Sequence, residues 1–410
     1  MTSHPFAHPV YVMLKPAGSA CNMSCSYCYY LEKGEREDIT KESKGMMSES
    51  IDGKGAMSEN IYGKGAMSEN LLDEFVKQYL DCQLQNEVLF TWHGGEPTLL
   101  PLSFYEKALE LQRKHARGRH IDNCIQTNGT LLTEEWCKFL ADNNFLVGIS
   151  IDGTQFQHDR FRKTKNGSSS HERVSQGIKL LNKYNVQWNA MAVINSRNQH
   201  EPLEFYRFFK DLDCRFIQFT PIVERKQSGK LLANNEGSFL NSEFTEESVN
   251  PEAYGKFLCD LFDEWVKEDV GEYFVQIFDA TLACWCRRFG MDVMPGMCSM
   301  CHQCGHAAVM EKNGDIYSCD HFVFPQYKLG NIRQKTLTEM LYSEQQTNFG
   351  KQKYEHLSKK CKACEWRFAC HGGCPKDRLP DGTNYLCKSY QMFFSHTAEW
   401  MRQKASELLQ

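Results

Sequence analysis

The chain reads Cys21-Asn22-Met23-Ser24-Cys25-Ser26-Tyr27-Cys28 directly after its first strand-like stretch. A loop with this CxxxCxxC spacing can direct three thiolates onto one face of a metal centre. In a four-iron cube, three ligands leave one iron without a protein ligand, and such an open position allows a metal centre to take part in chemistry. A zinc ion with a distant fourth ligand is the alternative. The aromatic Tyr27 and the position after a first strand favour iron.

On both sides of this motif, strand-like and helix-like stretches alternate over about the first 225 residues. The predicted strands are rich in β-branched and apolar residues; they are Val10–Leu14, Val88–Trp92, Cys124–Thr127, Leu146–Ile151, Trp188–Ile194 and Arg215–Thr220. The stretches between them have apolar residues at helical spacing; they are Leu71–Leu80, Phe104–His115, Glu134–Asn143, Arg173–Tyr184 and Pro202–Leu212. Strands that alternate with helices indicate a parallel sheet.

Six such units predict an α/β fold, a partial (βα)6 barrel, over residues 1–225. A linker and helical segment is expected over 226–297, and a cysteine-rich domain over 298–410. A surface loop at 40–67 contains most of a ten-residue repeat, which begins at Lys44, Lys54 and Lys64 and ends at Glu69. Three copies are too few for a solenoid, so we interpret them as a tandem duplication that lengthened the loop. A partner-binding role is the alternative.

Composition narrows the class of protein. The 410 residues carry a net charge of -5, and no basic excess indicates binding to nucleic acid. No apolar run approaches the roughly 18 residues that cross a bilayer, and the first residues lack a secretion-signal pattern. We therefore expect a cytoplasmic protein without a membrane span. Of the 19 cysteines, twelve gather in two clusters, which in a reducing compartment indicates metal ligands rather than disulfides. The other seven are scattered, and we expect most of them to be core residues.

The first cysteine motif resembles the signature of the radical S-adenosylmethionine superfamily, CxxxCxΦC, in which Φ is aromatic. The stretch His93-Gly94-Gly95-Glu96-Pro97, at the end of the second predicted strand, is similar to the superfamily's GGEP motif. The resemblance implies that Cys21, Cys25 and Cys28 hold a [4Fe–4S] cluster whose open iron binds S-adenosylmethionine. It also implies a set of residues that bind this cofactor: Tyr27, Gly95, Ser150, Arg162 and Val223.

Nine further cysteines lie between Cys298 and Cys387, with CxxC and CxxxC spacings that are specific for metal. Two structural zinc ribbons are one interpretation. The pattern also resembles the SPASM domain of radical enzymes, which binds two auxiliary [4Fe–4S] clusters. The resemblance assigns one cluster to Cys298, Cys304, Cys319 and Cys374, and the other to Cys361, Cys364, Cys370 and Cys387. Cys301 is left over and is an alternative ligand for Cys298 or Cys304.

Over nearly its whole length the chain is similar to the anaerobic sulfatase-maturating enzymes. The shared stretches include Leu14-Lys15-Pro16, Tyr29-Tyr30-Leu31, Gln126-Thr127-Asn128-Gly129-Thr130, Phe145–Gly153, Gln218-Phe219 and Cys319-Asp320. The resemblance implies a radical oxidoreductase that converts a cysteine or serine of an unfolded sulfatase, within a C/S-x-P/A-x-R motif, into Cα-formylglycine by β-hydrogen abstraction. It also implies an external electron donor such as a flavodoxin or ferredoxin, and we expect a monomer.

The resemblance gives Asp320, beside a cluster ligand, the role of proton acceptor. An ordinary aspartate has a pKa of about 3.9 and a thiol about 8.5, so direct transfer is uphill by roughly 6 kcal/mol. Asp320 can therefore act only if burial raises its pKa or if oxidation of the substrate radical acidifies the thiol.

Two other functions compete with this interpretation. One is a SPASM peptide modifier that forms thioether or carbon–carbon crosslinks. Such enzymes often carry an N-terminal recognition domain, for which the roughly 20 residues before the cysteine motif leave no room. The other is a non-enzymatic zinc or iron–sulfur module, which the metal content of the anaerobically purified protein would distinguish.

Overall fold

The computed structural model describes residues 10–28, 65–227, 230–231 and 243–409. Its contacts divide the chain into two compact units, each built from separate stretches of sequence. Unit 1 contains Met1–Leu146, Arg162–Val186 and Ala307–Ser343; unit 2 contains Val147–Phe161, Gln187–His306 and Glu344–Gln410. Each unit thus contains residues from both sides of position 298. The division into three sequential domains stays a prediction.

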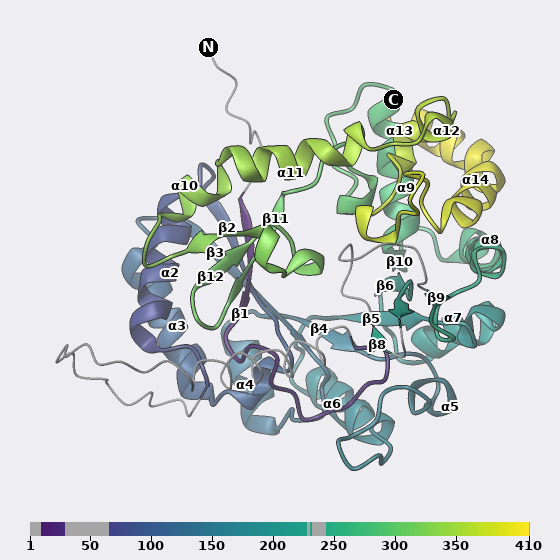
Figure 1. The fold of residues 1–410 in the computed structure, drawn as a ribbon. Coiled ribbons are helices and arrows are strands. Elements are labelled where there is room, and N and C mark those ends of the chain that lie inside the picture. The colour runs from purple at the N-terminus through teal and green to yellow at the C-terminus, as the bar shows by residue number, and fades with distance from the viewer. Residues whose placement is uncertain (1–9, 29–64, 228–229, 232–242, 410) are drawn as a thin grey trace. The chain divides into compact units, whose positions relative to one another are not determined.

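The six predicted strands all form, with ends within a few residues of those expected (Figure 1). They are β1 (Tyr11–Lys15), β2 (Glu87–Trp92), β3 (His120–Thr127), β4 (Leu146–Ser150), β5 (Trp188–Ile194) and β6 (Phe216–Pro221). The predicted helices follow them as α2 (Glu69–Asp81), α3 (Leu102–His115), α4 (Glu134–Asp142), α6 (His171–Lys183) and α7 (Pro202–Asp211). The alternation of strand and helix that indicated an α/β fold is confirmed.

In unit 1, β2 pairs in parallel with both β1 and β3. A strand from far along the chain, β11 (Ala307–Glu311), pairs in parallel with the other edge of β1, where Tyr11 lies opposite Ala307. The short strands β12 (Asp315–Tyr317) and β13 (Lys328–Asn331) continue the sheet in antiparallel order. Segments on both sides of β1 therefore hold in place the strand that leads into Cys21.

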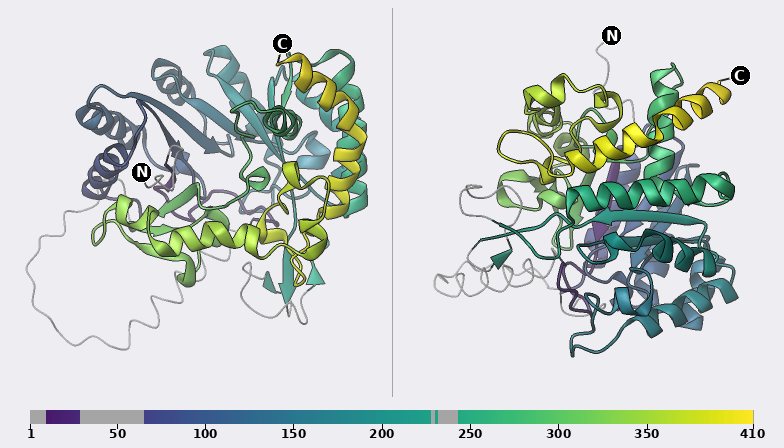
Figure 2. Two further views of the ribbon diagram at one scale, coloured as in Figure 1. Left: turned by 90° about the horizontal axis from the view of Figure 1, so that it is seen from above. Right: turned by 90° about the vertical axis from the view of Figure 1, so that its right-hand side faces the viewer.

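In unit 2, β5 pairs in parallel with β4 and β6, and β10 (Phe274–Val275) pairs with β6. Helices α8 (Pro251–Glu268) and α14 (Cys387–Glu407) pack side by side, as Figure 2 shows, with α9 (Gln276–Arg288) against α14. Ring contacts join these helices, with Phe262 lying 5.5 Å from Trp400 and Phe278 lying 5.5 Å from Phe393. This aromatic core holds the beginning of α14, and with it Cys387.

The remaining elements are short. Five further helices are α5 (Gln155–His158), α10 (Leu337–Leu341), α11 (Glu344–Glu355), α12 (Lys359–Lys362) and α13 (Arg367–Cys370). Single turns of 3-10 helix form at Pro97–Leu99, Asn198–His200, Cys298–Met300, Asp320–Phe322, Pro325–Tyr327 and Pro375–Asp377. A small sheet of β7 (Arg225–Gln227), β8 (Lys230–Leu231) and β9 (Glu243–Phe244) lies where the sequence predicts only a loop. Strands this short and polar pair through backbone alone and leave no apolar periodicity to detect.

Most of the ten-residue repeat, and Tyr29-Tyr30-Leu31 before it, lie outside the described residues. The last copy is described from Gly65 onward, and its Met67 is fully buried, with a backbone N–H that donates to Pro16 O at 2.9 Å. Ser68 then begins α2 as its N-cap residue. Among the helices that the structure describes, none is both long and apolar enough to span a bilayer.

Candidate active site

The cluster loop, Cys21–Cys28, begins six residues after the end of β1 and is held by its own unit. Its three cysteines are partly buried. The N–H of Ser24 donates to Lys163 O at 2.8 Å, and Met23, which is 2% exposed, forms an isolated bridge with Thr164. Within the loop, the N–H of Cys28 donates to Cys25 O at 3.0 Å. Residues 163–164 therefore fix the middle of the loop while its thiols remain near the surface.

Two predicted cofactor-binding residues contact each other beside this loop. The guanidinium of Arg162 lies over the ring of Tyr27, 5.5 Å from the centroid, and Arg162 is only 8% exposed. A cation over an aromatic face is stabilised by the ring quadrupole. The structure thus brings Arg162 to the cluster loop, as expected of a residue that binds a carboxylate there.

The Gly-Gly turn after β2 approaches the segment before Cys21 closely. The N–H of Gly95 donates to Gly18 O and that of Glu96 donates to Ala20 O, both at 2.8 Å. A Cβ atom on Gly95 would stand 2.2 Å from Ala20 O, so no side chain fits at this position. Glycine here allows two backbones to meet. This cradle fits the predicted role of Gly95 in binding S-adenosylmethionine beside the cluster loop.

Glu96 is fully buried and braces the same turn from within. Its Oε1 accepts from the N–H of Thr98 at 3.0 Å and from the hydroxyl of Thr127 at 2.6 Å, while Oε2 accepts from the N–H of Asn128 at 2.8 Å. Burial raises the pKa of Glu96, and these donors oppose that effect. The carboxylate therefore ties the GGEP turn to the end of β3, a role that sequence reasoning missed.

A hydrogen-bond chain continues from β3 to the cluster loop. Asn128 Nδ2 donates to Asn22 Oδ1 at 2.9 Å, and Asn22 Nδ2 donates to Thr130 Oγ1 at 2.8 Å. Thr130 in turn donates to Asn128 Oδ1 at 2.7 Å. The stretch Gln126–Thr130, noticed in the sequence only as a shared motif, thus orients the residue that follows Cys21.

Asp320, the predicted proton acceptor, forms an ion pair with Lys15 at the end of β1. The Lys15 side chain is fully buried, and that of Asp320 is 17% exposed. The ion pair fixes the carboxylate of Asp320 at the end of β1, the strand that leads into the cluster loop. The ion pair was not foreseen, although Lys15 stood in a shared motif.

The other predicted cofactor-binding residues, Ser150 and Val223, belong to two separate stretches of unit 2. Ser150 ends β4 and is partly buried. Nearby Asp152 is fully buried and its Oδ1 accepts from the N–H of Val193 at 2.9 Å, so it supports β5. Because Ser150 and Val223 both fall within unit 2, the predicted set is divided between the two units, and its joint role stays a prediction.

Val223 O accepts a hydrogen bond from the buried Lys376 Nζ at 2.7 Å. The same ammonium pairs with Glu224 Oε1 at 3.0 Å and with Asp377 Oδ1 at 3.2 Å. Burial acts to lower the pKa of Lys376, but Asp377 and Glu224 outweigh it and raise that pKa. Because Lys376 follows Cys374 by two residues, this charge cluster ties the end of β6 to a predicted cluster ligand.

Four predicted ligands of one auxiliary cluster line a single cavity of about 320 Å³ in unit 2; they are Cys361, Cys364, Cys370 and Cys387. Burial raises the pKa of Cys370 to about 12, and the other three thiols act in the same direction because their charges would repel. Across the described ranges, no three Cys, His, Asp or Glu side chains converge as they would around one metal ion. Thiols spread around a cavity fit a four-iron cluster, which sets of four cysteines hold.

The other predicted set is less complete within one unit. Cys298, Cys304 and Cys374 belong to unit 2, and Cys319 belongs to unit 1. Burial raises the pKa of Cys304 to about 11, with Cys298 and Cys301 acting in the same direction. Cys301 is buried, and its thiol donates to Met297 O at 3.6 Å. That contact leaves Cys301 with a structural partner of its own, and its role as a ligand stays open.

The structure describes all 19 cysteines and forms no disulfide among them. Of the seven scattered cysteines, most are buried, as expected of core residues; the buried ones are Cys82, Cys137, Cys214, Cys284 and Cys286.

Comparison with known proteins identifies the parts of this chain. Residues 16–209 match the model of the radical SAM superfamily, and residues 298–365 match that of an iron–sulfur cluster-binding domain, SPASM. A serine-type anaerobic sulfatase-maturating enzyme of Bacteroides thetaiotaomicron is 53% identical over 100% of this chain and 94% of its own. A cysteine-type enzyme of Clostridium novyi is 34% identical over 93% of this chain and 94% of its own.

A solved structure, native anSMEcpe with bound AdoMet and Kp18Cys peptide, has a TM-score of 0.78 and 30% identity. It covers 97% of this chain and 99% of that one. The likeness spans both cysteine regions, so the partial-barrel radical SAM fold with a SPASM domain is confirmed. The chain belongs to the anaerobic sulfatase-maturating enzymes, a family of radical S-adenosylmethionine oxidoreductases that carry iron–sulfur clusters.

Proposed function

We propose that this enzyme oxidises a serine of an unfolded sulfatase to Cα-formylglycine. The 53% identity with a serine-type relative, against 34% with a cysteine-type one, supports serine. One structural observation carries the chemistry: Lys15 and Asp320 form an ion pair within the same unit as the cluster loop. Lys15 is the last residue of β1, the strand that leads into that loop. A proton acceptor is thereby fixed to the strand that positions the metal ligands.

The proposed cluster ligands are Cys21, Cys25 and Cys28. The residues proposed to bind S-adenosylmethionine, as the resemblance implies, are Tyr27, Gly95, Ser150, Arg162 and Val223. When bound, the cofactor and reduced cluster supply hydrogen abstraction from the β-carbon of the target residue. Glu96 and Asn128 hold the loop and the GGEP turn rigid, so that little further ordering of the site is needed at each turnover.

After abstraction, the substrate must lose one electron and one proton to become an aldehyde. Asp320 accepts the proton, and its ion pair with Lys15 holds the carboxylate in place beforehand. Because an ionised carboxylate is a weak base, this step requires the hydroxyl to become acidic as the substrate is oxidised. Cys361, Cys364, Cys370 and Cys387, which line one cavity, would hold an auxiliary [4Fe–4S] cluster, and that cluster would supply an electron acceptor when bound.

The proposal includes further partners. The substrate is an unfolded sulfatase segment with a C/S-x-P/A-x-R motif, supported by the peptide bound in the related solved structure. A flavodoxin or ferredoxin supplies the first electron, and the enzyme acts as a monomer in the cytoplasm, where its free thiols would stay reduced.

The test uses the anaerobically reconstituted enzyme, S-adenosylmethionine, a reductant and two peptides that differ only in serine or cysteine at the target position. Mass spectrometry should show that the serine peptide loses two hydrogen atoms. This product should form faster than the product of the cysteine peptide, in which an aldehyde oxygen replaces the thiol sulfur. A crosslinked product of unchanged side-chain oxygen content would instead favour a thioether or carbon–carbon maturase. Cleavage of S-adenosylmethionine without any peptide product would refute both.

A further inference from the structure

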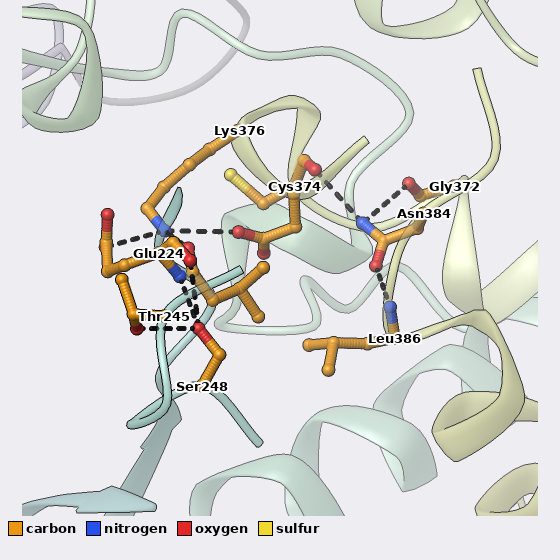
Figure 3. Close-up of polar contacts among 10 residues, drawn as sticks. Glu224, Thr245, Ser248, Gly372, Cys374, Lys376, Asn384 and Leu386 are labelled. Atoms are coloured by element: carbon orange, nitrogen blue, oxygen red, sulfur yellow. Dashed lines mark hydrogen bonds and ion pairs between the residues drawn. The ribbon is translucent and has the colours of Figure 1, made fainter. Parts of the chain in front are cut away.

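Three buried cations surround the cysteines of unit 2, and their partners differ. Lys376 lies against the carboxylates of Glu224 and Asp377, which neutralise it (Figure 3). Arg378 and Lys353 are 7% and 1% exposed. Within the described ranges, neither forms an ion pair with a carboxylate. A charge buried without a counter-charge is costly, so these two cations require negative charge from another source.

The hydrogen bonds of Arg378 place its guanidinium on the short segment between the two predicted ligand sets. Its Nε donates to Gly372 O at 3.3 Å and its Nη2 donates to His371 O at 3.4 Å. These residues join Cys370, which belongs to the cysteine cavity, to Cys374, which belongs to the other set. A Cβ on Gly372 would stand 2.8 Å from Nη2, so the guanidinium is packed directly against this backbone.

Asn384 holds the same segment from its other side. Its Nδ2 donates to Gly372 O at 3.3 Å and to Cys374 O at 3.1 Å, and its Oδ1 accepts from the N–H of Leu386 at 2.8 Å (Figure 3). Arg378 and Asn384 also form an isolated β-bridge. The guanidinium is therefore fixed relative to both Cys370 and Cys374 rather than free to turn toward solvent.

Electrostatic coupling agrees with this placement. Burial lowers the pKa of Arg378, and four thiols act to raise it: Cys304, Cys361, Cys374 and Cys370. Two of these belong to each predicted set. Lys353 is different, because its Nζ donates to Cys298 O and Ser299 O, both at 2.9 Å, and so it lies beside one set only.

We propose that Arg378 is a counter-charge shared by the two auxiliary cluster sites and that it raises the reduction potential of both. The inference rests on the cluster ligands proposed above. A cluster held by four thiolates is negatively charged, and reduction adds one electron and no proton, so the charge beside the guanidinium grows by one. A fixed cation stabilises the reduced form more than the oxidised form. Lys353 acts in the same way on the Cys298 site alone.

This placement has a consequence for the reaction. An acceptor of the substrate's electron must hold that electron at an accessible potential, and burial of a cluster in protein acts against the added negative charge. Arg378 offsets that cost at both sites, so either one becomes a better electron acceptor.

The test uses the full chain with Cys21, Cys25 and Cys28 replaced by alanine, so that only the auxiliary clusters give a signal. Potentiometric titration followed by electron paramagnetic resonance is made on this background. Arg378→Gln should lower both reduction potentials by at least about 59 mV, which for one electron is a tenfold change in the reduction equilibrium. Arg378→Lys should retain most of the potential, and Lys353→Gln should shift one cluster only. The control Arg402→Gln, an exposed change on α14, should shift neither.

Unchanged potentials in Arg378→Gln, with iron content intact, would overturn the proposal, as would a shift confined to one cluster. If that variant loses a cluster, Arg378→Met removes the charge without adding a polar group and is titrated in its place, with the same two outcomes. Loss of a cluster in both variants would make Arg378 structural and also overturn the proposal. No peptide or S-adenosylmethionine is present, so the result is independent of whether serine is the substrate.

Discussion

The cluster loop of unit 1 and the cysteine cavity of unit 2 hold their thiols in different ways. The loop offers three cysteines, Cys21, Cys25 and Cys28, and is braced from outside by backbone contacts and by the buried Glu96. The cavity offers four, and it is lined by the ends of short helices and the beginning of α14. Three ligands leave an iron open to a cofactor, whereas four close the cluster. The comparison teaches that the ligand count separates catalysis from electron storage, and that each region is built accordingly.

The largest expected effect comes from removing one thiol in each region. Cys25→Ala should abolish formation of 5′-deoxyadenosine, because two thiolates cannot hold the catalytic cluster. Cys364→Ala should lose the iron of one auxiliary cluster yet still cleave S-adenosylmethionine. Chromatography of 5′-deoxyadenosine and iron analysis of both variants provide the measurement. Equal loss of cleavage in the two variants would show that the regions do not have separate roles.

Asp320→Asn gives the next largest effect and separates cleavage from product. The variant should cleave S-adenosylmethionine at the normal rate but lose about 10²–10⁴-fold in formylglycine, the usual contribution of a general base. Asp315→Asn is the matched control, since Asp315 is similarly buried, belongs to the same unit and pairs with Lys328 at 2.7 Å. Product yield that falls equally in both variants would remove Asp320 from the proposed chemistry.

Much of the catalytic region could be predicted because its motifs are local. The spacing of Cys21 to Cys28 and the turn at Gly95 are continuous in sequence, and each follows a strand whose apolar pattern is clear. The braces could not be predicted in the same way. Lys15 meets Asp320 across 305 positions, and Glu96 meets Thr127 across 31, so only the pairing of β1 with β11 and of β2 with β3 brings them together.

In the cysteine-rich region the limits are different. The sequence predicted the ligand sets from resemblance, but it gave no sign that residues 307–343 would pair with β1. The burial of Arg378 and Lys353 could not be predicted, because no apolar periodicity marks a side chain buried among cysteines. Burial in such a region depends on turns and on metal ligands rather than on a repeating pattern.

Glu96→Gln tests whether the brace of the catalytic region depends on a carboxylate. An amide at Oε2 would point its own N–H toward the N–H of Asn128, and one buried donor would lose its acceptor. We expect a loss of about 1–3 kcal/mol in the free energy of unfolding. Chemical denaturation measures the effect, with the exposed Glu87→Gln, nine residues earlier on β2, as control. Equal stabilities of the two variants would show that the turn does not depend on a carboxylate at position 96.

The smallest expected effect is a gain of stability in unit 2, in contrast to the loss expected at Glu96. It concerns Asp279 on α9, a partly buried carboxylate. Burial alone raises the pKa of Asp279 to about 6, whereas at Glu96 several hydrogen-bond donors oppose the rise that burial causes. Since the folded-state pKa exceeds that of the unfolded chain, the ionised group costs stability at pH 7, and the cost disappears as the pH falls through 6 toward 4. Asp279→Asn should therefore gain about 1 kcal/mol at pH 7, after allowance for partial exposure, and nothing at pH 4. Denaturation at both pH values, with the exposed Asp292→Asn as control, measures this, and a loss of stability at pH 7 would mean that Asp279 has a partner as Glu96 does.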